Sequence, residues 1–244
     1  ARGAVHAVLE AFELGQSAGT AVGEVLWGEA NPSGVLSFTL YPEAYVHEVR
    51  MGDMSMRAGG IGRTYRFYAG QPLWAFGHGE SYTTWAIELL HPGGPAPFPA
   101  STARAAGIVG GPLVFRARVT NTGKVAGARV VLAYVGGGPI PDGPVKSLFG
   151  LAKVSLAPGE GADVSFDATA TLAGCPLCTT DWDGSTLVRR GTYLITLGGS
   201  GARDGGCAAG ARGCLATLSV HLEGPDQAAP RAAGASRLST AVLI

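Results

Sequence analysis

Four acidic residues are the first candidates for chemistry in this sequence, because they lie in expected loops beside a segment rich in aromatic side chains. They are Glu43, Glu48, Asp53 and Glu80. Two carboxyl groups held at a fixed separation can share the roles of nucleophile and general acid–base, and functional residues are common on loops. No pair of acids here has a spacing or an apolar setting that suits these roles. We therefore interpret all four as surface residues.

The four cysteines offer a second kind of chemistry. Cys175 and Cys178 have the CxxC spacing of a redox or zinc motif, whereas Cys207 and Cys214 do not. A redox CxxC begins a helix in a βαβ context, but expected strands flank this one, and zinc binding stays a minor alternative. Disulfides are the default in a secreted β-protein. We expect Cys207 to pair with Cys214, and Cys175 and Cys178 to pair locally or with the other two.

His78 and three arginines complete the polar candidates. His78 lies between two glycines without cysteine or acid partners, which favours a hydrogen-bonded turn residue over a base or a metal ligand. Arg57, Arg63 and Arg66 carry planar guanidinium groups that suit bidentate pairing with carboxylates. We predict that these arginines fix the surrounding segment to the rest of the protein. The sequence indicates no metal site and no cofactor.

Residues 42–84, here called the strap, must position these groups. Residues 61–83 are the central stretch of the strap. This stretch alternates aromatic residues with Gly62, Gly70, Gly77 and Gly79 and fits no regular element. Its aromatic residues carry too much apolar area to stay in water. We predict that the strap docks between two lobes and buries Tyr65, Phe67, Trp74 and Phe76. A sugar-binding surface, with rings stacked on pyranose faces, is the alternative.

The composition excludes several classes of protein. The 244 residues include 18 Lys+Arg and 18 Asp+Glu, so no basic surface indicates binding to nucleic acid or to an anionic membrane. No apolar run approaches the roughly 20 residues of a membrane-spanning helix. The first residues show neither an initiator methionine nor a signal peptide.

Hydrophobic periodicity divides the remaining chain into two parts. Residues 7–12 are a strand or a helix start, residues 17–27 a helix with Ser17 as its N-cap, and residues 35–41 an alternating strand. This strand–helix–strand order predicts a piece of an α/β sheet. After a strand at residues 85–90 and a loop insertion at 91–111, five segments alternate with period two and predict a β-sandwich. They are residues 113–120, 128–135, 162–168, 192–197 and 215–222.

Several motifs in order resemble family 3 glycoside hydrolases, in particular the plant and fungal β-xylosidase branch. They are GRTYRFYAG (62–70), FGHGESYT (76–83), NPSG (31–34), LYPEAYV (40–46), MGDMSMR (51–57) and VTNTGKVAG (119–127). The resemblance covers residues 12–222. Glu80 departs from the family, which has an apolar residue there.

The resemblance implies a mixed fold in four parts. Residues 1–41 would be the C-terminal remnant (βαβ) of an α/β sandwich domain, and residues 42–84 the strap. Residues 85–224 would form an all-β fibronectin type III-like sandwich, with the insertion at 91–111, and residues 225–244 a disordered tail.

The resemblance also implies a function that this chain does not carry out alone. The nucleophile aspartate and the acid/base glutamate of the family fall upstream of this chain, so no catalytic residue is carried over and the substrate-binding residues stay unknown. We expect a C-terminal piece, or a truncated gene product, of a secreted β-xylosidase or α-arabinofuranosidase that needs no cofactor and binds oligosaccharides through upstream domains. The alternative is a non-catalytic carbohydrate-binding or structural module. Xylose, arabinose or glucose preference and the oligomeric state are not predicted.

Overall fold

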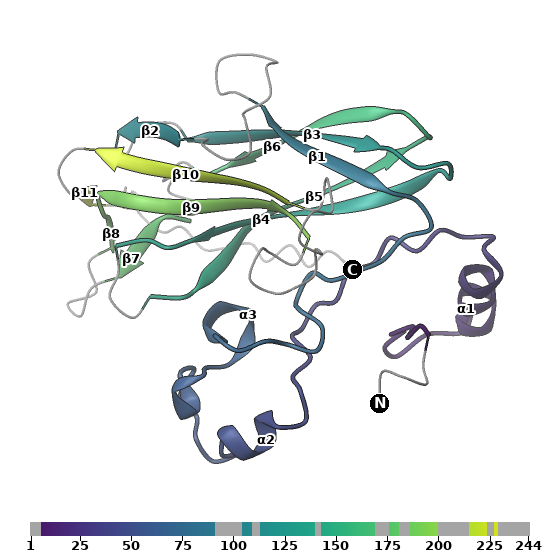
Figure 1. Ribbon diagram of the computed structural model, residues 1–244, viewed down its shortest axis with the longest axis horizontal. Coiled ribbons are helices and arrows are strands. Elements are labelled where there is room, and N and C mark those ends of the chain that lie inside the picture. Colours follow the sequence, from purple (N-terminus) through teal and green to yellow (C-terminus); the bar gives the residue numbers. More distant parts are fainter. Residues whose placement is uncertain are drawn as a thin grey trace, which may run out of the picture.

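The structure is a computed structural model in which residues 6–90, 104–108, 113–139, 143–168, 176–180, 186–199, 215–223 and 227–228 are described. Within these residues a β-sandwich dominates, and the helices are few and short (Figure 1). None of the described helices is long and apolar enough to cross a membrane.

Two sheets form the sandwich. The first has the order β1 (Trp85–Leu90), β3 (Val114–Asn121) and β6 (Gly161–Asp167). The second has the order β2 (Arg104–Ile108), β10 (Leu215–Glu223), β9 (Gly191–Gly198), β4 (Gly127–Gly136) and β5 (Lys146–Leu156). Neighbouring strands are antiparallel except β2, which runs parallel to β10. A small third sheet has the order β11 (Gln227–Ala228), β8 (Thr186–Val188) and β7 (Cys178–Thr180).

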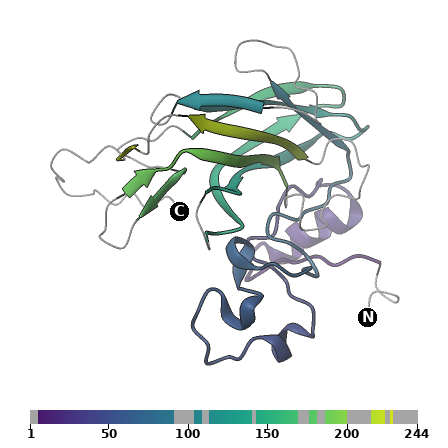
Figure 2. The same ribbon diagram turned by 60° about the vertical axis from the view of Figure 1, so that its left-hand side comes forward.

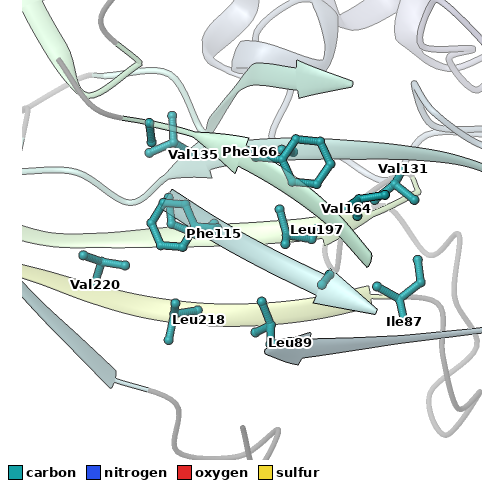
Figure 3. Close-up of a cluster of buried hydrophobic side chains, with 14 of the residues drawn as sticks. Ile87, Leu89, Phe115, Val131, Val135, Val164, Phe166, Leu197, Leu218 and Val220 are labelled. Atoms are coloured by element: carbon teal, nitrogen blue, oxygen red, sulfur yellow. The ribbon is translucent and has the colours of Figure 1, made fainter. Parts of the chain in front are cut away.

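Alternating side chains of both sheets form the core (Figure 3). In β3, Phe115, Ala117 and Val119 are buried while Arg116 and Arg118 face water. Ile195 of β9 and Val220 of β10 are fully buried on the facing sheet. Because successive residues of a strand point to opposite faces, the period of two seen in the sequence produces this core directly.

The sandwich predicted from alternation is present, with strands at each of the five expected places and at residues 85–90. Two strands of the sandwich were not predicted, and neither were the three short strands of the small third sheet. β5 reads KSLFGLAKVSL, and its first residues are half-buried on both faces, so they do not alternate. β2 lies within the segment 91–111, which we interpreted only as a loop insertion, and the rest of that segment lies outside the described residues.

The expected βαβ remnant is wrong in its strands and right in its helix. Helix α1 (Ala18–Trp27) follows Ser17 and ends at Gly28, whose φ of +80° is left-handed, although the Ser17 side chain makes no capping bond. Residues 7–12 form no strand, and residues 35–41 contribute only one isolated bridge, between Leu40 and Trp74. A strand needs a neighbour for its backbone groups, and within the described residues only the strap offers one here.

The strap is irregular, as predicted, apart from three short turns of helix. These are α2 (Tyr45–Glu48), η1 (Ala58–Gly60) and α3 (Thr64–Phe67). Figures 1 and 2 show α1 and the helices of the strap on the same side of the sandwich. Of the expected disordered tail at 225–244, only the short strand β11 is described.

Candidate functional site: the docked strap

The outer face of β4 is the place where the strap attaches to the sandwich. Residues 130–135 read VVLAYV, a continuous apolar run, and all six side chains are buried. Val131, Ala133 and Val135 belong to the sandwich core. The opposite side chains, Val130, Leu132 and Tyr134, form a second cluster. It is covered by Val35, which precedes the strap, by Tyr65 and Phe76 of the strap, and by Leu148 of β5. Burial on both faces explains why this strand does not alternate.

Two aromatic rings of the strap make the closest part of this contact. Tyr65 and Phe76 stack with ring centroids 4.3 Å apart, and each meets the edge or face of Tyr134, at 6.1 Å and 6.5 Å. The Leu148 backbone N–H donates to Tyr65 Oη at 3.4 Å. Aromatic pairs at such distances add about 0.5–1.5 kcal/mol beyond the area that they bury. The rings therefore serve as packing groups between the strap and β4.

Gly77 allows the backbone of the strap to approach the sheet. Its φ is +82°, and a Cβ there would lie 2.6 Å from Leu132 Cδ1, 2.9 Å from Tyr134 Oη and 3.2 Å from the Gly199 carbonyl oxygen. The same backbone joins residues 35–41, because the Gly77 N–H donates to Leu36 O at 2.7 Å and the Leu36 N–H donates to His78 O at 2.8 Å. Glycine is required here both for its dihedral angle and for its lack of a side chain.

The end of the strap is held by two buried or half-buried asparagines. Asn31 accepts bonds from Ser81 Oγ and from the Tyr82 N–H, each at 2.9 Å, and donates to Ala126 O at 3.1 Å. These bonds connect the NPSG turn, the strap and the start of β4. Tyr82 Oη in turn donates to Val25 O of α1 at 2.6 Å.

Asn121 provides the second connection. Its side chain is fully buried, accepts from Thr83 Oγ1 at 2.6 Å and donates to Val125 O at 2.9 Å and Leu156 O at 3.1 Å. The Gly123 N–H also donates to Asn121 Oδ1, at 3.1 Å. In the sequence alone, Asn-Thr-Gly at 121–123 indicates only a turn. A buried amide that satisfies loop carbonyls depends on chain segments far away in sequence, which composition does not reveal.

A second aromatic cluster lies within the strap and beside its start. Tyr41 and Tyr45 stack at 4.0 Å, and both meet the ring of Tyr68 at nearly right angles. The phenol of Tyr45 donates to Gly62 O at 3.0 Å. Burial is the main cause that raises the pKa of Tyr45, and burial together with the nearby Glu48 raises the pKa of Tyr68. The three rings contact one another, which indicates packing rather than ligand binding.

The four aromatic residues expected to be buried are half-buried instead. Tyr65 and Phe76 contact β4, and Phe67 lies under the guanidinium of Arg57, with its Cζ 4.9 Å from the ring centroid. Trp74 pairs with Leu40 through backbone bonds. Tyr65 and Phe76 thus cover one outer sheet face, and all four side chains keep part of their surface accessible.

The arginines fix the strap, but through partners that were not expected. Arg63 Nη2 donates to the carbonyl oxygens of Arg50, at 3.1 Å, and Asp53, at 2.5 Å. Arg57 Nη2 donates to Gly143 O at 3.4 Å. The carbonyl of Arg66 accepts from the Val145 N–H at 2.6 Å. Backbone carbonyls and an aromatic face take the place of the expected carboxylates.

The acids and His78 show no arrangement for catalysis. Glu43, Glu48 and Glu80 are exposed, and the carboxylate of Asp53 accepts the Ser55 N–H at 2.9 Å. His78 takes part in a backbone turn, and its Nε2 lies 3.9 Å from Glu80 Oε1. Within the described part of the chain, no three His, Cys, Asp or Glu side chains gather as a metal site would require.

Cys178, at the start of β7, is disulfide-bonded. The other cysteines, Cys175, Cys207 and Cys214, lie outside the described residues. The choice of pairing therefore stays a prediction.

Comparison with known proteins identifies the class to which this arrangement belongs. Residues 1–82 match the glycosyl hydrolase family 3 C-terminal domain. The exo-1,4-β-xylosidase bxlB of Emericella nidulans is 35% identical over 200 residues, which cover 78% of this chain and 25% of that protein. A probable β-glucosidase I of the same organism is 34% identical over 211 residues, covering 80% of this chain and 23% of that protein.

A solved structure of a family 3 exo-β-xylosidase (XlnD), in complex with a xylobiose aziridine activity-based probe, superposes with a TM-score of 0.68. The two are 26% identical, and the match covers 88% of this chain and 27% of that one. The chain belongs to glycoside hydrolase family 3. It corresponds to the C-terminal part of such a glycosidase, and it spans about a quarter of the length of the curated relatives it matches.

Proposed function

We propose that this chain is the C-terminal region of a retaining, exo-acting glycosidase of the β-xylosidase/α-arabinofuranosidase type. The whole enzyme would act on xylan-derived oligosaccharides in carbohydrate catabolism. An exo-1,4-β-xylosidase among the relatives supports this substrate class, and the likeness to an exo-β-xylosidase bound to a xylobiose-derived probe agrees with it. A β-glucosidase at nearly the same identity makes glucosides the competing substrate.

Within that enzyme, this region has a structural role. The observation that carries the proposal is the docking of the strap, which starts in the part matched by the family model and ends against β4 and Asn121 of the sandwich. The sandwich, which we interpret as a fibronectin type III-like module, is thereby held to the segment that completes the α/β domain. A retaining mechanism needs two carboxyl groups about 5–5.5 Å apart, and upstream domains would supply both.

Secretion is part of the proposal, and the disulfide at Cys178 supports it, because disulfides persist in oxidising compartments. We expect none of the four cysteines to be free in protein collected from the culture medium. Thiol titration under denaturing conditions measures this. Four free thiols would contradict both the pairing and the compartment.

The test compares this chain with the full-length product of its gene. Both are incubated with aryl β-xylosides, aryl α-arabinofuranosides and aryl β-glucosides. We expect turnover only from the longer protein, and the preferred glycoside then settles the substrate class. Turnover by the chain alone that disappears in Glu43→Gln, Glu48→Gln, Asp53→Asn or Glu80→Gln would place the active site in the strap and refute the proposal.

The rival hypothesis, a carbohydrate-binding module, makes a different prediction. Tyr65 and Phe76 stack on each other and Tyr45 meets Tyr68, whereas Trp27 at the end of α1 is 79% exposed. If xylo-oligosaccharides in an affinity gel retard the chain alone and Trp27→Ala abolishes the retardation, the binding-module hypothesis is correct.

A further inference from the structure

The three methionines of the chain occupy one short loop and are the most unusual apolar residues on its surface. They are Met51, Met54 and Met56, between α2 and η1. Met51 is 96% exposed and Met54 is 88% exposed. Residues 50–56 are called the methionine loop below. Methionine is a flexible apolar side chain that adapts to irregular partner surfaces, and clustered exposed apolar residues mark interaction sites.

The backbone of the methionine loop is fixed although its side chains are exposed. Arg63 Nη2 donates to the carbonyls of Arg50 and Asp53, and the Ser55 N–H donates to Asp53 Oδ1 at 2.9 Å. The Arg63 N–H donates to Met56 O at 2.8 Å, which closes the loop. A loop held by these bonds presents its methionines in one arrangement, so that binding would cost little ordering of the backbone.

Residues on both sides of the loop connect it to the rest of the protein. Val49 and Ala58 are buried, and Arg57 reaches the ring of Phe67 and the Gly143 carbonyl. Figure 1 shows α2 well below the sheets of the sandwich. The exposure of the methionines shows that the described part of the chain does not cover them.

The exposed apolar side chains are unevenly distributed over the described residues. Most of them lie before residue 57, in the part that matches the family 3 C-terminal domain, and few lie on the sandwich. Those before residue 57 are Val8, Leu9, Phe12, Leu14, Leu26, Trp27, Val46, Met51, Met54 and Met56. About three quarters of each curated relative falls outside the match. The exposed apolar side chains thus gather in the part that matches the C-terminal domain, and the relatives have further chain that could cover them.

We propose that the methionine loop is a preformed docking site for the upstream catalytic part of the glycosidase polypeptide. This inference rests on the proposed function. The upstream surface that receives the loop is apolar and irregular, since a charged surface would gain nothing from thioethers.

Oxidation of methionine provides the test, because it follows exposure. This chain is compared with a longer protein in which the upstream three quarters of the E. nidulans exo-1,4-β-xylosidase precede it. Both are treated with hydrogen peroxide, and the sulfoxides are quantified by peptide mass spectrometry. We expect Met51 and Met54 to oxidise about tenfold more slowly in the longer protein. Leu151 of β5, which is 64% exposed, serves as the reference. Its rate of radical labelling should be the same in the chain alone and in the longer protein.

A double variant, Met51→Lys with Met54→Lys, keeps Met56 as a reporter in the longer protein. We expect the variant to release Met56 to rapid oxidation, while Leu151→Lys leaves Met56 protected. Circular dichroism of both variants of the chain alone should match the unchanged chain, because all the replaced residues are exposed. Met56 that stays protected in the double variant would overturn the proposal.

The remaining outcomes separate this inference from the proposed function. Turnover of aryl glycosides by the longer protein with unprotected methionines would overturn the docking site and leave the proposed function intact. Protection without turnover would retain the docking site and count against the proposed function. If the methionines of the chain alone become protected as the protein concentration rises, a second copy is the occupant. If they are protected only when xylo-oligosaccharide is added, a ligand is the occupant. Either result overturns the proposal.

Discussion

Replacing Gly77 by alanine tests whether the strap is held on β4 by close backbone approach. Gly77 has a φ of +82°, and an added Cβ would lie 2.6 Å from Leu132 Cδ1 and 2.9 Å from Tyr134 Oη. A left-handed φ costs a residue with a side chain about 1–2 kcal/mol. Overpacking against a buried strand adds about 1–3 kcal/mol. We therefore expect Gly77→Ala to weaken docking of the strap by about 2–5 kcal/mol.

Gly159 supplies a matched control. Its φ is +78°, nearly that of Gly77, but nothing lies within 4 Å of the position of its Cβ. It follows Pro158 in the turn between β5 and β6, where the Glu160 N–H donates to Ala157 O at 3.0 Å. Gly159→Ala carries the cost of the dihedral angle, about 1–2 kcal/mol, without a collision. The difference between the free-energy costs of the two substitutions measures the contact of residue 77 with β4.

Hydrogen exchange of the Leu36 amide reports on docking, because this amide donates to His78 O in the strap at 2.8 Å. A loss of 2 kcal/mol in the free energy of docking corresponds to an increase in local opening of about 30-fold, and a larger loss to more. Amides of β3 serve as a reference for the sandwich itself. The reasoning is refuted if the Leu36 amide exchanges equally fast in Gly77→Ala and Gly159→Ala.

Three further predictions concern the packing and the stability of the two parts. Asn121→Ala should lower the free energy of unfolding by about 3 kcal/mol in urea titrations, since several buried groups lose their partner; a loss below about 1 kcal/mol would contradict this role. Burial holds the pKa of Tyr45 and Tyr68 above the ordinary 10.0. The two neutral phenols therefore contribute their full stabilisation of the folded state below pH 10, and this stabilisation is lost as the pH rises through the folded-state pKa. Absorbance at 295 nm should show phenols that ionise late, and a titration in which all seven tyrosines ionise together would count against it. Limited proteolysis of the chain should leave residues 113–222 protected and cut residues 1–41 early; equal protection of both in a monomer would show that the N-terminal part folds alone.

The elements that local sequence specifies were predicted well. Helix α1 lies where its apolar spacing and Gly28 place it, and β3 alternates as Phe115, Ala117 and Val119 require. Alternation and helix ends depend on residues within a few positions of one another, so they can be interpreted without knowledge of the fold. The motifs of the strap identified the family for the same reason, because they are contiguous.

Residues 35–41 show what the sequence could not decide. Leu36, Phe38 and Leu40 alternate as in a strand, yet the only partner in the described structure is the strap, and a single bridge results. Likewise, VVLAYV in β4 indicates burial on both faces, but only the fold shows that Tyr65 and Phe76 provide the second cover. Asn121 reads as a turn residue and is in fact a fully buried connection to Thr83. Each of these depends on a partner tens of residues away, and such pairings are determined by tertiary packing rather than by local pattern.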